Sequence, residues 1–299
     1  MSITGMRVVI VTQYASALRG MVRQCRAKGH TPVAVICTRK EPSRDGAGSP
    51  GMKAMAKSIV AACPAGMAVA VVDSRAQLAE LVEHYAPDLL LVRGFPWRLP
   101  PRVLEVAEHG SVNLHPSELP RHRGPFPVHR AIAEGAERLS VTAHRMDAGF
   151  DTGPILATAS IDIAADEFGP AIWAGVDRAA DQVLALALDR IAAGEKGEPQ
   201  DDAAATYAGA FDAGEAAVDW RRPVRDVHNL IRTWSLGSIG TPGADGPEVE
   251  LDGRPVRILR TSLTEIDGPS LPCGDGRLWL AEYQELSRSK SSSDHERDE

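Results

Sequence analysis

The stretch Asp88-Leu-Leu-Leu-Val92 indicates the fold class of this chain. It is a short apolar run without polar alternation, which is typical of a strand buried on both faces of a parallel sheet. Similar runs occur at residues 7–12, 32–37, 68–72 and 111–114. The segments expected to be helical are 15–28, 52–63 and 75–85, and Asp73 or Ser74 can cap the last of these. Residues 38–51 are expected to form a loop. Strands alternating with helices in this way predict an α/β fold, a doubly wound and mostly parallel sheet.

Polar side chains gather where one of these strands ends. In Ser111-Val-Asn-Leu-His-Pro-Ser117, Asn113 and His115 stand two positions apart, so both point to the same face of the strand. Ligands of such sheets bind beyond the carboxyl ends of the strands. A glycine-bearing loop, Met146-Asp-Ala-Gly-Phe-Asp-Thr-Gly153, supplies the carboxylate of Asp151.

An amide, an imidazole and a carboxylate are the groups needed to transfer an acyl group. The amide of Asn113 and a protonated His115 can hold a developing oxyanion, while Asp151 raises the pKa of the imidazole and orients it. Each residue also has an ordinary structural interpretation, because Asn, His and Asp are common in turns. Asp151 could cap a turn at Gly153, and Asp147 offers a second carboxylate in the same loop.

Composition limits the remaining possibilities. The 299 residues suffice for one large and one smaller domain, and no run of 18 apolar residues or signal peptide is evident, so we expect a soluble, cytoplasmic protein. The four cysteines have no metal-ligand spacing, and we expect no metal site. The first strand is followed by Gln13-Tyr-Ala-Ser16 rather than a Gly-x-Gly-x-x-Gly turn, which argues against a nicotinamide dinucleotide site.

A longer pattern resembles a known family. It runs Asn113-x-His115-Pro-Ser117-x-Leu119-Pro120-x-His122-Arg123-Gly124, then Pro127, Glu134-Gly135, Val141-Thr142 and Asp147-x-Gly149-x-Asp151-Thr152-Gly153. This pattern resembles that of formyltransferases that use 10-formyltetrahydrofolate, a family that includes methionyl-tRNA, glycinamide ribonucleotide and sugar-nucleotide formyltransferases. The resemblance implies catalytic roles for Asn113, His115 and Asp151, and 10-formyltetrahydrofolate as co-substrate.

The resemblance also implies two binding regions. The residues expected at the cofactor are Phe95, Trp97, Arg98 and Leu99 from one loop and Asp147, Ala148, Gly149 and Phe150 from another. In the first loop the match is partial, and Phe95 and Trp97 could instead anchor the sheet. The residues expected near the acceptor are Ser117, Arg121 and Arg123, which could alternatively form a solvated basic face.

The expected domain organisation is a catalytic domain over 1–195, a linker over 196–206, a small domain over 207–286 and a disordered tail over 287–299. Tyr207-Ala-Gly and Val218-Asp-Trp220 resemble the start of the carboxyl-terminal domain of methionyl-tRNA formyltransferases. Residues 249–259 and 276–281 are expected to be strands, and the resemblance implies a small β-rich, OB-like domain.

The identity of the formyl acceptor is left open by the sequence. The first loop lacks the Gly-Thr-Pro string usual in methionyl-tRNA formyltransferases, and the second domain is short. Residues 197–299 hold 11 Lys and Arg against 20 Asp and Glu, a net charge of −9, whereas residues 1–196 carry +2. A tRNA partner usually requires a basic surface. These departures favour a specialised small-molecule or sugar amine over methionyl-tRNA.

Two further hypotheses remain at this stage. One is a hydrolase that releases formate from the same cofactor, with water replacing the amine. The other is a folate-binding protein without activity, which the presence of Asn113, His115 and Asp151 together disfavours.

Overall fold

The computed structural model describes residues 5–39, 50–237 and 246–286, which divide into two compact units. The first unit takes the described residues up to Ala131 together with Glu137–Ile163 and Ile172–Gly209. The second takes Ile132–Ala136, Ala164–Ala171 and the described residues from Ala210 onward. The second unit thus includes two short segments from within the first part of the chain.

The first unit is built on a seven-stranded sheet in the order β3-β2-β1-β4-β5-β6-β7. The first five strands in this order are parallel, and β6 and β7 are antiparallel to their neighbours. The bounds are β1 Arg7–Thr12, β2 Thr31–Thr38, β3 Ala68–Val72, β4 Leu89–Arg93, β5 Ser111–His115, β6 Arg138–Arg145 and β7 Ile155–Asp162. The predicted doubly wound, mostly parallel sheet is therefore confirmed.

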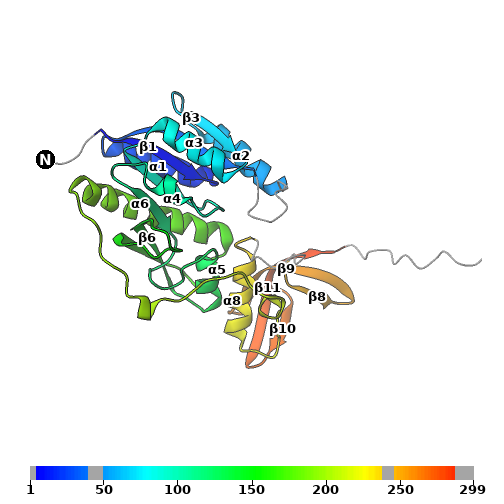
Figure 1. The fold of residues 1–299 in the computed structure, drawn as a ribbon. Coiled ribbons are helices and arrows are strands. Elements are labelled where there is room, and N and C mark those ends of the chain that lie inside the picture. Colours follow the sequence, from blue (N-terminus) through cyan, green and yellow to red (C-terminus); the bar gives the residue numbers. More distant parts are fainter. Residues whose placement is uncertain (1–4, 40–49, 238–245, 287–299) are drawn as a thin grey trace, which may run out of the picture. The chain divides into compact units, whose positions relative to one another are not determined.

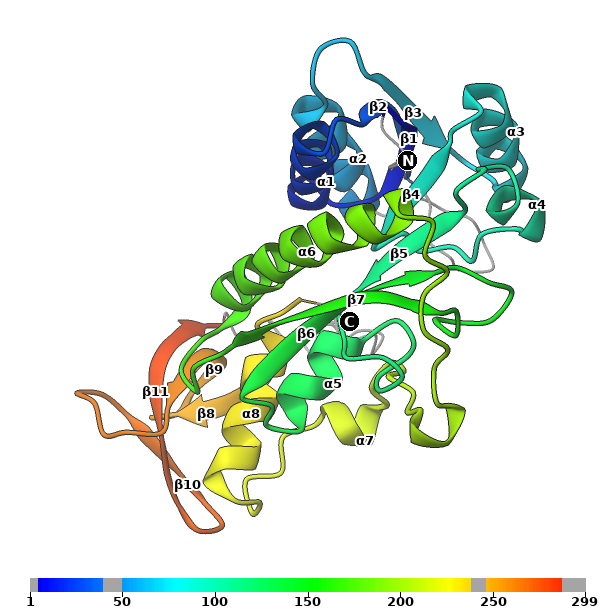
Figure 2. The same cartoon turned by 90° about the vertical axis from the view of Figure 1, so that its left-hand side faces the viewer.

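Helices cover both faces of this sheet, with α1, α2 and α6 on one face and α3 and α4 on the other (Figure 2). The bounds are α1 Ala15–Ala27, α2 Pro50–Ala62, α3 Arg75–Tyr85, α4 Pro101–Leu104, α5 Pro127–Ala133, α6 Gly169–Ala192 and the 3₁₀ helix η1 Asp202–Ala204. Local signals set the limits of these helices. Ser74 caps α3 by accepting a hydrogen bond from the N–H of Gln77, as the sequence allowed.

The core of the first unit explains the unbroken apolar runs. Residues of β1, β2 and β4, including Val9, Ile36 and Leu90, are fully buried and pack against Leu78 and Val82 of α3. A strand covered on both faces needs apolar side chains at every position. The carboxyl end of β5 emerges from this core and places Asn113 and His115 at the rim of the sheet.

The second unit contains a four-stranded antiparallel sheet in the order β10-β11-β9-β8 (Figure 1). The bounds are β8 Glu248–Leu251, β9 Arg254–Ser262, β10 Ser270–Cys273 and β11 Gly276–Glu285, with α7 Ala213–Ala216 and α8 Val224–Trp234. Val227 and Ile231 of α8 pack against Ile258 and Leu278 of the sheet. The small β-rich domain expected from the sequence is therefore present.

One expectation about this sheet is wrong. A single strand was expected over 249–259, but the chain reverses at Asp252-Gly253 between β8 and β9. Both residues have positive φ, 49° for Asp252 and 75° for Gly253. An Asp-Gly pair favours the tight turn that joins two antiparallel strands. The Asp-Gly pair was the sequence signal for this turn, and the prediction of one continuous strand overlooked it.

The expected domain boundaries stay a prediction. Residues 198–208, around the expected linker, run alongside the first unit through main-chain hydrogen bonds to Ile155 and Arg123. The expected tail over 287–299 and most of the loop over 38–51 lie outside the described residues. Among the described helices, none is both long and apolar enough to cross a membrane.

Candidate active site

Strand β5 brings Asn113 and His115 to one place beside the neighbouring strand β6. Asn113 lies opposite His144, and His115 lies opposite Thr142, in the antiparallel register. His115 is buried and Asn113 is partly buried. Because alternate residues of a strand share a face, the two side chains point into the same region, as the sequence predicted.

The loop between β6 and β7 adds Asp151 to this group, and its two carboxylates have different surroundings. Asp147 accepts hydrogen bonds from the N–H of Gly149 at 2.9 Å and from the hydroxyl of Thr152 at 2.6 Å, so it closes the turn. Asp151 has a φ of 55°, and its side chain points away from the turn toward Asn113 and His115. The local turn-forming role that was open for Asp151 therefore belongs to Asp147.

Four groups surround the carboxylate of Asp151. The N–H of Gly124 donates to Oδ2 at 2.9 Å, and the side-chain nitrogen of Asn113 donates to Oδ1 at 3.3 Å. His115 Nδ1 lies 3.6 Å from Oδ2, and His144 Nε2 lies 3.5 Å from Oδ1. The amide of Asn113 must present its NH₂ to this carboxylate, because the opposite orientation would face oxygen with oxygen.

The hydrogen bonds fix the tautomer of His115. Its Nε2 lies 2.8 Å from the carbonyl oxygen of His122, and a carbonyl only accepts, so Nε2 carries the proton. In the neutral ring, Nδ1 then presents its lone pair toward Asp151. A proton taken up by His115 would therefore reside on Nδ1, between the imidazole and the carboxylate.

The pKa of His115 corrects one expectation. Burial lowers the pKa of His115, and this effect outweighs the raising effects of Asp151 and of the His122 carbonyl. We expected Asp151 to raise the pKa and keep the ring charged. Asp151 does raise the pKa, as expected, but the loss of hydration at the end of β5 lowers it further, so the ring is not held charged.

Asp151 is ionised in this environment. Burial by itself raises the pKa of Asp151, but hydrogen bonding by His144, the charge of His115 and the N–H of Gly124 together hold the pKa at about 2. Since burial favours neutral His115, the N–H of Gly124 and the amide of Asn113 are the donors that stabilise the carboxylate near neutral pH. The site thus combines a buried anion with a neutral imidazole that can accept a proton.

His144 was not identified from the sequence. It is buried on β6, its Nδ1 lies 2.9 Å from the carbonyl oxygen of Arg145, and its Nε2 lies 3.3 Å from the nitrogen of Asn113. The available signal was the alternation in β6, RLSVTAHR, where Ser140, Thr142 and His144 stand at every second position. Its significance depends on the antiparallel pairing of β5 and β6, which the sequence did not reveal.

The residues expected at the cofactor lie on two loops that approach each other. The guanidinium carbon of Arg98 lies 5.5 Å from the ring centre of Phe150, whose side chain is 54% exposed. Asp147, Ala148 and Gly149 are exposed in the same loop as Phe150.

Two residues of the first loop have buried side chains. Trp97 and Leu99 belong to the hydrophobic core, and Phe95 packs against it, so their side chains have the anchoring position that the sequence left open. Within the described residues, the main-chain N–H groups of Trp97 and Leu99 donate no hydrogen bond.

The three residues expected near the acceptor have different surroundings. The hydroxyl of Ser117 donates to the carbonyl of Arg121 at 2.7 Å, which stabilises the loop after β5. Arg123 is held by Gln200 and by Asp202 at 2.8 Å. Arg121 is exposed. Of the three, Arg121 has the side chain most accessible to an acceptor.

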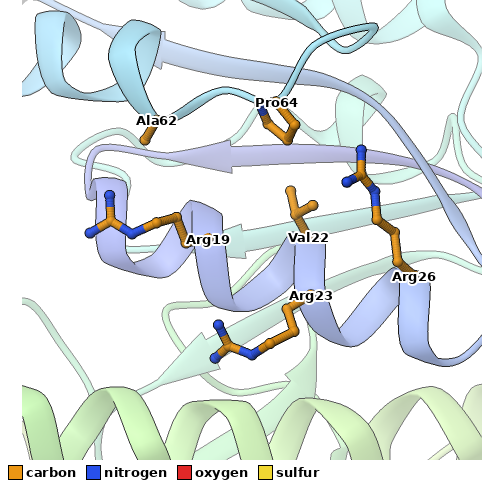
Figure 3. A pocket seen from close by; sticks show the side chains of 6 residues that line it. All are labelled: Arg19, Val22, Arg23, Arg26, Ala62 and Pro64. Atoms are coloured by element: carbon orange, nitrogen blue, oxygen red, sulfur yellow. The ribbon is translucent and has the colours of Figure 1, made fainter.

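A separate cavity of about 370 Å³ lies between α1 and the segment after α2 (Figure 3). It is lined by Arg19, Val22, Arg23, Arg26, Ala62 and Pro64. None of these residues belongs to the predicted site. The described residues contain no group of three His, Cys, Asp or Glu side chains suited to a metal ion.

The doubly wound sheet, with an amide, an imidazole and a carboxylate at its rim, defines a group-transfer enzyme of the α/β class. Residues 6–188 match the sequence model of the formyl transferase family. The chain therefore belongs to the formyl transferase family of enzymes, which use formyl-tetrahydrofolate.

Several relatives and solved structures are similar to the chain. A methionyl-tRNA formyltransferase of Pseudomonas putida is 36% identical over 221 residues, which cover 71% of this chain and 69% of the relative. One from Dinoroseobacter shibae is 32% identical over 275 residues and covers 89% of both chains.

Among solved structures, HypX from Aquifex aeolicus in complex with tetrahydrofolic acid is similar, with a TM-score of 0.66 at 16% identity. The similarity covers 95% of this chain but only 45% of HypX. A 4-N formyltransferase from Francisella tularensis has a TM-score of 0.60 at 15% identity, over 84% of this chain and 95% of the other. At these identities the likeness shows a shared fold.

Proposed function

We propose that this enzyme transfers the formyl group of 10-formyltetrahydrofolate to a primary amine, with Asn113, His115 and Asp151 as the catalytic residues. The observation that carries the proposal is the convergence of these side chains at the carboxyl end of β5, within 3.3 to 3.6 Å of one carboxylate. The bound co-substrate supplies a formamide carbonyl.

His115 has the central role in proton transfer. As a neutral base it can accept a proton at Nδ1, where the carboxylate of Asp151, 3.6 Å away, stabilises the charge that forms. The positive charge of the imidazolium then lies beside the amide of Asn113. This charge favours the transition state because negative charge develops on the formyl oxygen. The proton removed from the attacking amine is returned to the departing folate nitrogen.

The loops around Arg98 and Phe150 are the proposed cofactor region. The exposed ring of Phe150 fits the flat face of a pterin ring, and Phe95, Trp97 and Leu99 anchor the first loop to the core. We further propose the expected roles of Asp147, Ala148 and Gly149 in closing this region.

For the acceptor we propose a small-molecule or sugar amine. The net charge of −9 over residues 197–299 supports this choice, since a nucleic acid partner is repelled by an acidic domain. Ser117, Arg121 and Arg123 are proposed on the acceptor side, with Arg121 the most exposed of the three.

Methionyl-tRNA is the second candidate acceptor, and two observations favour it. The curated relatives that are 32 to 36% identical are methionyl-tRNA formyltransferases. In addition, described residues 5–39 and 50–72 contain eight Lys and Arg and no Asp or Glu, so the first unit is much more basic around α1 and α2 than its net charge suggests. A local concentration of this kind is what a phosphate backbone requires.

A turnover assay separates these possibilities. Release of tetrahydrofolate from 10-formyltetrahydrofolate would be followed by absorbance with amino sugars, amino acids or methionyl-tRNA as acceptor. Turnover with a small amine and none with the tRNA supports the proposal, whereas formylation of the tRNA replaces it with the second candidate. Formate release without any acceptor would identify a hydrolase, and binding without turnover would identify a folate-binding protein.

A further inference from the structure

Residues 198–208 form a segment that returns along the candidate active site. Glu198 and Ile155 exchange two main-chain hydrogen bonds of 2.8 Å. Further on, the N–H of Arg123 donates to the carbonyl of Thr206 at 2.9 Å, and the N–H of Ala208 donates to that of Arg123 at 2.7 Å. The segment is therefore held at both ends against the loops that carry the proposed catalytic residues.

Gln200 lies between these two attachments, and its side chain is fully used. Its Nε2 donates to the carbonyl oxygens of Asp151 at 2.8 Å and Gly153 at 2.7 Å. Its Oε1 accepts from Arg123 Nε at 3.1 Å and Nη2 at 2.8 Å. Both hydrogens and both lone pairs of the amide have a partner, so its orientation is determined.

The backbone that Gln200 holds is unusual. Asp151 has a φ of 55°, in the left-handed region that side chains other than glycine rarely adopt. A residue persists there when surrounding contacts hold it, and such residues are concentrated at functional sites. Gln200 holds the carbonyl of Asp151 itself and that of the residue two positions later, so it fixes the peptide planes from which the carboxylate projects.

We propose that Gln200 is a positioning residue, which holds Asp151 in its left-handed conformation and aims the carboxylate at His115 and Asn113. Through Oε1 it also ties this loop to Arg123, whose neighbour Gly124 donates the 2.9 Å hydrogen bond to Asp151. One amide therefore links the two loops that together orient the carboxylate. This inference rests on the proposed function, in which Asp151 acts through His115.

Substitution of Gln200 by glutamate separates the hydrogen bonds to the Asp151 loop from those to Arg123. In Gln200→Glu, one carboxylate replaces the amide, so the contact with Arg123 remains while donation to Asp151 and Gly153 becomes repulsion. Gln200→Ala removes both sets of hydrogen bonds. Asp202→Asn is the matched control, because Asp202 contacts Arg123 at 2.8 Å and, among the described residues, makes no hydrogen bond or ion pair with the Asp151 loop.

The readouts are kcat, the two KM values, the pH dependence of kcat and the melting temperature. We expect kcat to fall 10- to 100-fold in Gln200→Glu and Gln200→Ala with both KM values within threefold of wild type. We also expect the acidic limb of the pH profile to move to higher pH, since a displaced carboxylate loses the donors that lower its pKa. Asp202→Asn should retain the wild-type profile.

Two results would overturn the inference. Wild-type kcat in Gln200→Glu would show that only the contact with Arg123 matters, and a lower kcat with an unmoved pH profile would show a merely structural role. If Gln200→Ala does not fold, Gln200→Glu carries the test, because it keeps the Arg123 contact. Asp151→Asn distinguishes the two proposals: full activity in that variant would refute the proposed catalytic group itself, whatever Gln200 does.

Discussion

Replacing Asp151 with asparagine removes the charge at the centre of the candidate site while preserving its shape. The carboxylate accepts from Gly124 and Asn113 and faces both His115 and His144. An asparagine side chain has one oxygen and one NH₂ group, so one of these donors would face another donor. The variant therefore loses both the charge and at least one hydrogen bond.

The pKa of Asp151 gives the size of the effect on stability. It lies at about 2 against an ordinary value of 3.8, which corresponds to about 2 kcal/mol in favour of the charged form. A depressed carboxyl pKa contributes stability that is present above about pH 4 and is lost as the pH falls toward 2. At pH 7 we expect Asp151→Asn to lose up to about 2 kcal/mol of unfolding free energy, and its stability to fall less steeply between pH 4 and 2.

The effect on the rate should be larger than this loss of stability. Without the carboxylate, a proton at His115 Nδ1 has no counter-charge, so His115 becomes a weaker base and its positive charge is less stable. Loss of one such electrostatic contribution costs about 10²- to 10³-fold in kcat. The assay is tetrahydrofolate release with saturating co-substrate and acceptor, together with thermal melting to confirm folding.

Asp162→Asn is the matched control for this experiment. It makes the same chemical change in an exposed carboxylate of β7, which pairs with Arg138 at 3.0 Å on the surface. We expect wild-type kcat from this control. A kcat within threefold of wild type in Asp151→Asn would refute the reasoning, because the buried anion would then have no part in the reaction.

Three further predictions follow from the same structure. Asn113→Ala or His115→Ala should each lower kcat by about 10²-fold or more with little change in melting temperature, and near-wild-type turnover in both would contradict the mechanism. Gly124→Ala should lower both the melting temperature and kcat, because Gly124 has a φ of 112° and an added Cβ would lie 2.7 Å from the ring of Tyr207. Unchanged values would show that the loop adapts freely to the added Cβ. Burial lowers the pKa of His129 to about 4, so the free energy of unfolding falls as the pH drops below 6.5 and the unfolded chain takes up a proton at this ring. Between pH 6.5 and 5, denaturant titrations should show that His129→Gln loses about 2 kcal/mol less unfolding free energy than the wild type. Equal losses in the two proteins would show that His129 does not cause this pH dependence.

Much of the fold was predictable because burial on both faces imposes a simple pattern. The unbroken apolar runs that include Leu90 and Val9 identified the parallel strands, and Ser74 marked the start of α3. The reversal at Asp252-Gly253 was missed because flanking apolar residues resembled one continuous strand. The antiparallel strands β6 and β7 were not identified, because their alternating sequences, RLSVTAHR and ILATASID, differ from the unbroken apolar runs of the parallel strands.

Sequence alone also brought Asn113 and His115 together, because strand periodicity puts residues two apart on one face. It named Asp151 through the family pattern, but the separate roles of Asp147 and Asp151 required the turn geometry.

Only the tertiary structure decided what depends on distant segments and on burial. His144 joins the site because β6 pairs with β5, and Gln200 reaches Asp151 from 49 residues further along the chain. The direction of the pKa of His115 likewise reverses once the ring is buried. The local sequence pattern therefore determined which groups this protein brings to its site. Their charge and orientation were decided by hydration and by hydrogen bonds between distant segments, because no local pattern encodes either.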